Sequence, residues 1–222
     1  MEKLAHIEDW VAWSNAPSAA FRSANGQTTA LSGQSLPPML KRRLNAQGRA
    51  CCEILNQLIP NADLPVIHAS RHGDLQTSLT LLSDIVSDGH ASPARFSLSV
   101  HNAVLGVYSI ASGNQNSMQA LAARGGEFDA AMEEAAGYLH DGHPAVVVLL
   151  SDDAAPVLLS GHLSQPRHAC AVGLRLTLSS GQPLCRTAAP DVGNPGPIDV
   201  LEWLETPSAE LPARALWTLG SL

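Results

Sequence analysis

Charged and aromatic residues are scarce in this sequence, and it has no long apolar run. Of its 222 residues, 15% are charged, 4% are aromatic and 45% are hydrophobic. This composition excludes a disordered chain and indicates a domain with a substantial buried core. The longest apolar run, residues 145–150, is far shorter than the roughly 18–20 residues that span a bilayer. The N-terminal segment carries acidic residues where a signal peptide would be apolar. We therefore expect a cytoplasmic protein without a membrane span.

An excess of basic residues is also missing. The chain has 13 Lys and Arg against 20 Asp and Glu, a net charge of −7. Nucleic-acid-binding proteins usually carry a basic surface interleaved with aromatic residues, so nucleic acid is excluded as a partner. The four cysteines show no CxxC spacing, which is typical of reduced core thiols and not of a disulfide scaffold; they are Cys51, Cys52, Cys170 and Cys185.

The motifs of the common cofactor and metal sites are absent. The sequence contains no P-loop, no GxGxxG, no GxSxG and no HExxH. Of the nine histidines, His68 and His72 are four residues apart, but the expected break between strand and loop keeps them off a common helix face. We expect no nucleotide cofactor and no metal.

Hydrophobic periodicity predicts alternating helices and strands. This order indicates an α/β domain with a mainly parallel central sheet covered by helices on both faces. Residues 15–38 read as a long loop or lid, residues 117–121 are too short to assign, and residues 182–197 are rich in Pro and Gly. Helices are expected over residues 7–13, 38–58, 75–86, 102–112, 128–139 and 199–204, and strands over residues 64–69, 93–100, 145–150 and 169–178.

A group of polar residues follows the first expected buried strand, at residues 70–74. In α/β folds, ligands bind beyond the carboxyl ends of the strands. Ser70 and His72 therefore offer a nucleophile and a base, with Arg71 as a ligand-binding residue. The other interpretation is a hydrogen-bonded loop that caps the next helix, which is the commoner use of such residues.

A second polar group is the basic cluster Lys41, Arg42 and Arg43, followed by Arg49 on the same expected helix. Clusters of this size are usually solvated. The functional interpretation is a docking surface for an acidic partner, such as an acyl carrier protein.

The run SPARFSLSVHNAVLGVYSIASG at residues 92–113, preceded by RRL at residues 42–44 and ASRHGD at residues 69–74, resembles a known family. These are the short β-ketoacyl-synthase-like proteins, which match the N-terminal half of a ketosynthase and are associated with aryl polyene and xanthomonadin-type pigment clusters. The resemblance implies half of a thiolase-like fold in a single domain over residues 1–222. Residues 1–150 carry the likeness, and residues 151–222 form a divergent strand and loop tail.

The resemblance also implies where a nucleophilic cysteine would lie. Counting from Gly106, which matches the glycine of the family's Asn-x-x-x-Gly helix, the nucleophile falls near Gly125, before a helix over residues 126–140. The sequence has no cysteine between Cys52 and Cys170, and acyl transfer onto the enzyme needs a thiolate. The histidines that a ketosynthase carries in its C-terminal half also find no counterpart in 222 residues. We therefore expect that this chain does not catalyse condensation by itself.

These observations lead to a first functional hypothesis. The chain is a non-catalytic subunit of polyene or fatty-acid-type biosynthesis, which pairs with an active ketosynthase as a chain-length factor does, or binds an acyl carrier protein. Ketosynthases dimerise around the region that matches residues 112–121, so Met118 and Leu121 are the expected interface residues. A homodimer could equally well pair with the exposed strand edge expected in this region.

Two further hypotheses remain open. One is a small acyl-thioester hydrolase or transferase that uses Ser70 and His72. The other is a small-ligand site at His101 and Asn102, for which the simpler interpretation, and the one we prefer, is that Asn102 caps the helix that follows it.

Overall fold

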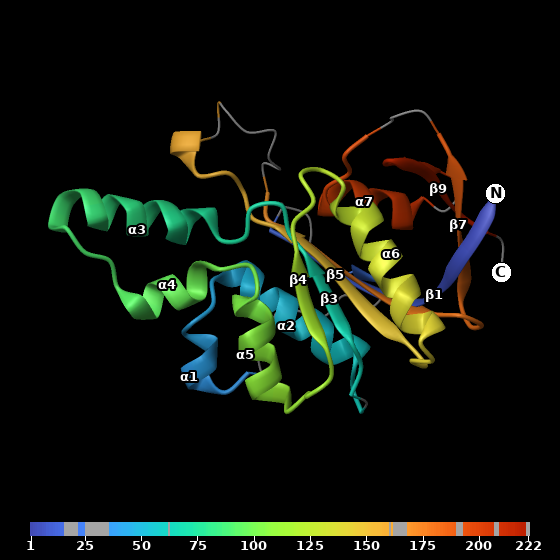
Figure 1. Ribbon diagram of the computed structural model, residues 1–222, viewed down its shortest axis with the longest axis horizontal. Coiled ribbons are helices and arrows are strands. Elements are labelled where there is room, and N and C mark those ends of the chain that lie inside the picture. The colour runs from blue at the N-terminus through green and yellow to red at the C-terminus, as the bar shows by residue number, and fades with distance from the viewer. Residues whose placement is uncertain are drawn as a thin grey trace.

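A mixed β-sheet organises the molecule (Figure 1). The computed structural model describes residues 1–15, 22–24, 36–61, 63–159, 161, 168–189, 193–206 and 209–220. Nine strands form one sheet in the order β4-β3-β5-β6-β1-β7-β9-β8, with β2 paired to β1. The strands are β1 (Glu2–Ser14), β2 (Arg22–Ser23), β3 (Val66–Ala69), β4 (Met118–Leu121), β5 (Val146–Asp152), β6 (Cys170–Thr177), β7 (Gln182–Ala188), β8 (Glu210–Pro212) and β9 (Ala215–Leu219).

The α/β class is confirmed, but the expectation of a mainly parallel sheet is wrong. Only β4 and β5 run parallel to β3, and every other pairing is antiparallel. The direction of each strand follows from the segment that connects it to the strand before it. Helices link β3 to β4 and β4 to β5, as parallel crossovers require. In the described part of the chain, the later strands follow one another without such crossovers, apart from α7 between β7 and β8.

Helices cover both faces of the sheet, as expected. Helices α2 (Ala46–Leu58) and α5 (Ala103–Ser112) pack on one side, and α6 (Glu127–His140) and α7 (Pro197–Glu205) on the other. Strand β5 shows the consequence, because Val146 and Val148 join the core beneath α6 while Val147 and Leu149 join the core beneath α2. All four side chains are fully buried, which explains the unbroken apolar sequence of this strand.

The expected helix over residues 7–13 is wrong, because these residues lie in β1. This strand pairs with β6 and β7, both of which come from the last quarter of the chain. Residues 4–7 and 11–14 of this strand are buried on both faces, with a register irregularity between Ile7 and Asp9. A strand buried on both sides does not alternate in hydrophobicity, so its pattern resembles that of a short helix.

The expected strand over residues 93–100 is also wrong, because Pro93–Ser99 forms helix α4. The Ser92 hydroxyl accepts a hydrogen bond from the Arg95 N–H at 3.4 Å, and Pro93 stands in the first turn, where the missing N–H has no cost. The alternation of Phe96, Leu98 and Val100 therefore occurs in a segment that belongs to no sheet.

The helix expected over residues 38–58 is divided into two. A short α1 (Pro38–Lys41) ends before Asn45, whose side chain caps α2 by accepting the Gly48 N–H at 2.8 Å. Lys41, Arg42 and Arg43 therefore do not share a helix with Arg49. Most of the expected loop or lid at residues 15–38 lies outside the described residues.

The remaining elements agree with expectation or replace an open assignment, except β2, β8 and β9, which the sequence patterns did not predict. Residues 117–121 contain the edge strand β4, and the Pro- and Gly-rich region begins with strand β7. No helix in the described part of the chain is long and apolar enough to cross a membrane. The expected elements that are confirmed are β3, α3 (Leu75–Asp88), α5, α6, β5, β6 and α7.

Candidate functional site

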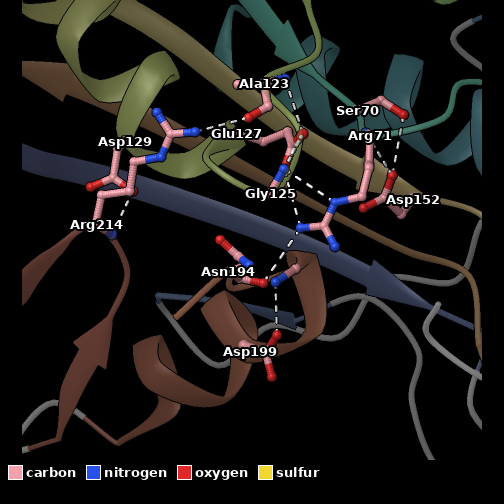
Figure 2. Close-up of polar contacts among 11 residues, drawn as sticks. Ser70, Arg71, Ala123, Gly125, Glu127, Asp129, Asp152, Asn194, Asp199 and Arg214 are labelled. Atoms are coloured by element: carbon pink, nitrogen blue, oxygen red, sulfur yellow. Dashed lines mark hydrogen bonds and ion pairs between the residues drawn. The ribbon is translucent and has the colours of Figure 1, made fainter. Parts of the chain in front are cut away.

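The site where the resemblance places a nucleophile lies at the start of α6, beside the carboxyl ends of β3 and β5 (Figure 2). Residues 193–196, which lead into α7, close it from the opposite side. The site therefore combines residues from four segments of the chain that are far apart in sequence.

Gly125 occupies the position of the expected nucleophile and has no side chain to offer. Its φ angle is +103°, a conformation that glycine adopts much more readily than other residues. A Cβ atom at this position would lie 2.7 Å from Cγ of Asn194. Both the backbone conformation and the neighbouring side chain therefore exclude a cysteine here without rearrangement.

The backbone N–H groups of this turn bind a carboxylate from the protein itself. Oε1 of Glu127 accepts hydrogen bonds from the N–H groups of Ala123 and Gly125, both at 3.0 Å. Burial acts to raise the pKa of Glu127, but these N–H groups and the nearby Arg71 charge outweigh it, so the pKa is lowered. The turn thus holds an ionised carboxylate beside the place where a ketosynthase would carry its thiolate.

The Arg71 side chain connects the end of β3 with the start of α6 and with residues 193–196. Its Nη2 lies 3.2 Å from Oε2 of Glu127 and donates to the backbone oxygen of Asn194 at 3.4 Å. Its side chain is 21% exposed, whereas that of Glu127 is 6% exposed. The ligand-binding role expected for Arg71 stays a prediction; in this structure its guanidinium binds protein groups.

Ser70 is buried beside Asp152 at the end of β5. Its hydroxyl donates to Oδ1 of Asp152 at 3.3 Å and accepts the Gly73 N–H at 3.1 Å. Oδ1 of Asp152 also accepts the Arg71 N–H at 2.9 Å. Burial raises the pKa of Asp152 to about 6 despite these hydrogen bonds.

The loop that contains Ser70 also caps the helix after it. Asp74 accepts the Thr77 N–H at 2.8 Å at the start of α3, as the capping interpretation requires. Burial and the Arg71 charge lower the pKa of His72. The Ser70 hydroxyl contacts described above involve Asp152 and Gly73, so the structure does not bring Ser70 and His72 together as a nucleophile and its base.

The other side of the turn is fixed by the C-terminal strands. Arg214 donates from Nη2 to the Ala123 oxygen at 3.1 Å, and its own N–H donates to Asp129 at 3.1 Å. Asp129 also accepts the Trp217 indole N–H at 3.0 Å. Figure 2 shows the contacts of Arg214 with Ala123 and Asp129 beside the Arg71–Glu127 pair. Sequence reasoning missed five residues of this site, namely Glu127, Asp129, Asp152, Asn194 and Arg214.

The cysteines offer no substitute nucleophile. All four are buried and free. Burial raises the pKa of Cys51 and of Cys170 to about 12 and raises that of Cys52 as well, which favours the unreactive thiol form. In the described ranges, no group of three His, Cys, Asp or Glu side chains is placed to hold a metal ion.

His101 and Asn102 lie between α4 and α5. Asn102 stands at the N-cap of α5, but its side chain makes no capping hydrogen bond, so the preferred capping interpretation is wrong. His101 lines a pocket of about 40 Å³ with His68 and Ser70. In the part of the chain that the structure describes, Nδ1 of His68 and Nε2 of His101 are buried without a hydrogen-bond partner. A ligand role for His101 stays a prediction.

The expected partner-binding residues lie away from the turn. Met118 and Leu121 are half-buried at the two ends of β4, the strand at the sheet edge. Arg42 and Arg43 are exposed in the turn between α1 and α2, with Lys41 just before them.

The comparisons with known proteins point to one family. The model described as "Beta-ketoacyl synthase, N-terminal domain" matches residues 10–197. No curated protein sequence matches the chain.

Solved structures agree with the family match. A structure titled as a ketosynthase (ApeO) in complex with its chain length factor (ApeC), from Xenorhabdus doucetiae, aligns over 100% of both chains with 20% identity and a TM-score of 0.80. The ishigamide ketosynthase/chain length factor aligns over 83% of this chain and 67% of its own, with 11% identity and a TM-score of 0.61. A β-ketoacyl synthase from Burkholderia phymatum STM815 aligns over 80% of this chain and 60% of its own, with 8% identity and a TM-score of 0.58. The α/β, thiolase-like fold that the resemblance implied is therefore confirmed.

Proposed function

The chain belongs to the family of β-ketoacyl synthase N-terminal domains, and from this premise we propose that it is a ketosynthase-like subunit without condensing activity of its own. It pairs with an active ketosynthase in the manner of a chain-length factor. The pathway is polyene or fatty-acid-type biosynthesis, in which the active partner supplies the cysteine.

The observation that carries this proposal is the structure of the turn at Gly125. A ketosynthase needs a thiolate at the start of the helix that follows this turn. Here a glycine with a positive φ angle stands at that place, Asn194 fills the space of a side chain, and Glu127 binds the free N–H groups. The arrangement preserves the frame of a ketosynthase while closing the position of its nucleophile.

Two of the similar structures support the choice of partner. Their titles describe a ketosynthase together with a chain length factor. The full-length alignment with a chain of the Xenorhabdus complex makes a subunit of such an assembly the simplest role for this chain.

The edge strand β4 is the proposed contact surface. Within the described residues it pairs on one side only, with β3. An open strand edge tends to pair with another chain. Pairing along β4 would bring Met118 and Leu121 into the interface.

The exposed basic residues suit a different partner. Arg42 and Arg43, beside Lys41, offer positive charge to the acidic surface of an acyl carrier protein. Reversing both arginine charges (R42E and R43E) would weaken binding of the carrier and leave binding of the ketosynthase unchanged; an unchanged affinity for the carrier would reject this surface.

The test begins with an affinity purification of the tagged chain from its native host, followed by mass spectrometry. We expect a full-length ketosynthase in near-equal amount, identified by its active-site cysteine peptide. Condensation is then assayed with the purified ketosynthase, with this chain, and with both. Activity of this chain alone, or a ketosynthase that neither binds it nor responds to it, would contradict the proposal.

A further inference from the structure

A small cavity lies where the start of α2, the carboxyl ends of β3 and β5, and the connection between α4 and α5 meet. Its volume is about 40 Å³. One water molecule needs about 10–15 Å³ of such space, so the cavity has room for a molecule of about three or four non-hydrogen atoms. The described residues that line it include none from residues 123–129 or 193–196, so the cavity is separate from the turn at Gly125.

Two imidazole rings in the lining of the cavity each have a nitrogen atom without a partner. Nδ1 of His68 and Nε2 of His101 are buried, and neither has a partner with hydrogen-bond geometry in the described part of the chain. His68 is only 4% exposed, so bulk solvent does not reach its ring. Because a buried polar atom without a hydrogen bond is unfavourable, the two nitrogen atoms indicate a ligand that carries a hydrogen-bonding group.

The other ring nitrogen of His68 belongs to a hydrogen-bonded chain. Nε2 lies 2.8 Å from Oγ of Ser151, and the Ser151 hydroxyl also hydrogen-bonds the Cys51 side chain. Since this hydroxyl can donate to either neighbour, Nε2 can carry the proton or lack it, and Nδ1 then accepts or donates accordingly. A ligand group that both donates and accepts suits His68 in either state, and a hydroxyl is the smallest group of this kind.

The electrostatics of the cavity favour an uncharged ligand. Burial lowers the pKa of His68 to about 4, although the nearby backbone of His101 acts in the opposite direction, so the ring is neutral at pH 7. The lining includes one basic residue, Arg43, and one acidic residue, Asp74, whose charges balance. A charged ligand would lose its hydration here without meeting a counter-ion of its own.

The rest of the lining suits a short carbon chain. Leu98, Val100 and Val104 contribute apolar surface from α4, from the connection that follows it and from α5. Small-molecule sites usually combine such apolar surface with a few convergent polar groups. A molecule with a hydroxyl at one end and a few carbon atoms at the other matches both parts of this cavity.

We propose that the cavity binds a small uncharged alcohol, whose hydroxyl hydrogen-bonds Nδ1 of His68 and Nε2 of His101 while its carbon chain contacts the apolar part of the lining. This site is separate from the turn and from the contact surfaces of the proposed function, and it does not depend on them. A bound alcohol would connect the end of β3 to the start of α5, and it would stabilise the fold because it binds only the folded chain.

The experiment titrates the purified, ¹⁵N-labelled full-length chain with 1-propanol and follows the histidine ring nitrogens by long-range ¹H–¹⁵N correlation spectra. We expect saturable shifts at Nδ1 of His68 and Nε2 of His101, with a dissociation constant in the millimolar range, as suits so small a ligand. The exposed His90 is the internal reference and should not shift. Propylammonium and propionate carry a charge on a chain of the same length, and each should bind at least tenfold more weakly.

Two variants test the contact with the imidazole. His101→Phe keeps a planar ring but removes the nitrogen atoms, and it should weaken binding of 1-propanol at least tenfold, as read from the His68 shifts. His90→Phe is the matched control and should leave binding unchanged. If circular dichroism shows that His101→Phe does not fold, Ala103→Val replaces it, since Ala103 lines the cavity and the larger side chain should exclude the alcohol while both histidines remain.

Three outcomes would overturn the proposal. Histidine shifts that rise linearly with 1-propanol and never saturate would show that the cavity takes no alcohol. Equal binding by the wild type and by the folded His101→Phe or Ala103→Val variant would place the alcohol elsewhere. Tighter binding of propylammonium or propionate than of 1-propanol would show that the site selects a charged ligand. None of these results bears on the association of the chain with a ketosynthase.

Discussion

Asn194 fills the space that a side chain at position 125 would need, with its Cγ 2.7 Å from the Cβ position of Gly125. The two residues are far apart in sequence and meet because residues 193–196 lie across the turn before α6. The contact leaves no room for a side chain where the family resemblance places the cysteine of a ketosynthase, and the cost of restoring a side chain can be measured.

Substitution of Gly125 by Ala should lower the free energy of unfolding by about 3 kcal/mol, because strain at positive φ and overpacking add. Urea denaturation measures this cost. Gly89 is the matched control, since its φ is also positive, +74°, but its Cβ position has nothing within 4 Å; G89A should cost only about 1 kcal/mol. Asn194→Ala in the G125A background should restore part of the loss. Equal costs for G89A and G125A would refute the role of Asn194.

Replacement of Glu127 by Ala should destabilise the fold by about 3 kcal/mol, because it leaves Arg71 without its buried partner and two N–H groups without an acceptor. Since the pKa of Glu127 is lowered, this stabilisation is present above its unfolded value of 4.5 and is lost as the pH falls below it. Glu133→Ala is the control, as Glu133 pairs with Arg186 at a site 57% exposed and should cost less than about 1 kcal/mol. Similar losses for both variants would argue against a special role for the turn.

The pKa of Asp152 predicts a pH dependence of the opposite sign. Its folded value of about 6 lies above the unfolded value of 3.8, so the folded state holds the proton more tightly. The resulting stabilisation is full below about pH 4 and is lost as the pH rises to about 6. Asp152→Asn should therefore be more stable than wild type at pH 7, by about 3 kcal/mol, and equal to it at pH 4. A constant difference across this range, seen in parallel urea titrations, would contradict the prediction.

Disruption of the edge strand should prevent association. Met118→Asp or Leu121→Asp places a carboxylate at the proposed interface, where desolvation without a partner is unfavourable. Light scattering of the purified complex should show that each variant dissociates. The control variant Val157→Asp, at a side chain that is 92% exposed, should remain associated. Because both positions are half-buried in the free chain, circular dichroism must first show that the variants fold. A folded variant with unchanged association would exclude β4 as the interface.

Hydrolysis of acyl thioesters provides the test of the alternative enzyme hypothesis. Ser70 bonds to Asp152 and is 3% exposed, so we expect no turnover by the purified chain above the rate of spontaneous hydrolysis. A rate that disappears in Ser70→Ala and in His72→Ala would instead establish the hydrolase or transferase activity.

Local sequence patterns correctly predicted the helices and strands whose own hydrophobic periodicity matches the conformation that they adopt in the fold. Helix α6 has a clear amphipathic repeat, and β5 is an unbroken buried run, so both were predictable. Residues 7–13 were not, because β1 owes its conformation to pairing with strands from the other end of the chain. For residues 93–100, the serine and proline at the start of α4 were a better signal than the alternation that followed.

Some residues of the candidate site could likewise be located from the sequence, and others could not. The position of Gly125 could be counted from the family resemblance, and the acidic Glu127 in the first turn of α6 is a favourable residue at a helix N-terminus. Asn194 and Arg214 could not be found this way. They reach the turn only through the sheet order and the path of residues 193–196, which no local pattern records.

The most direct test of the central claim is intact-mass spectrometry of the purified pair after incubation with a short-chain acyl thioester. The account predicts that the ketosynthase gains the mass of one acyl group, while the mass of this chain does not change. An acyl adduct on this chain would show that it carries a nucleophile of its own and would contradict the account.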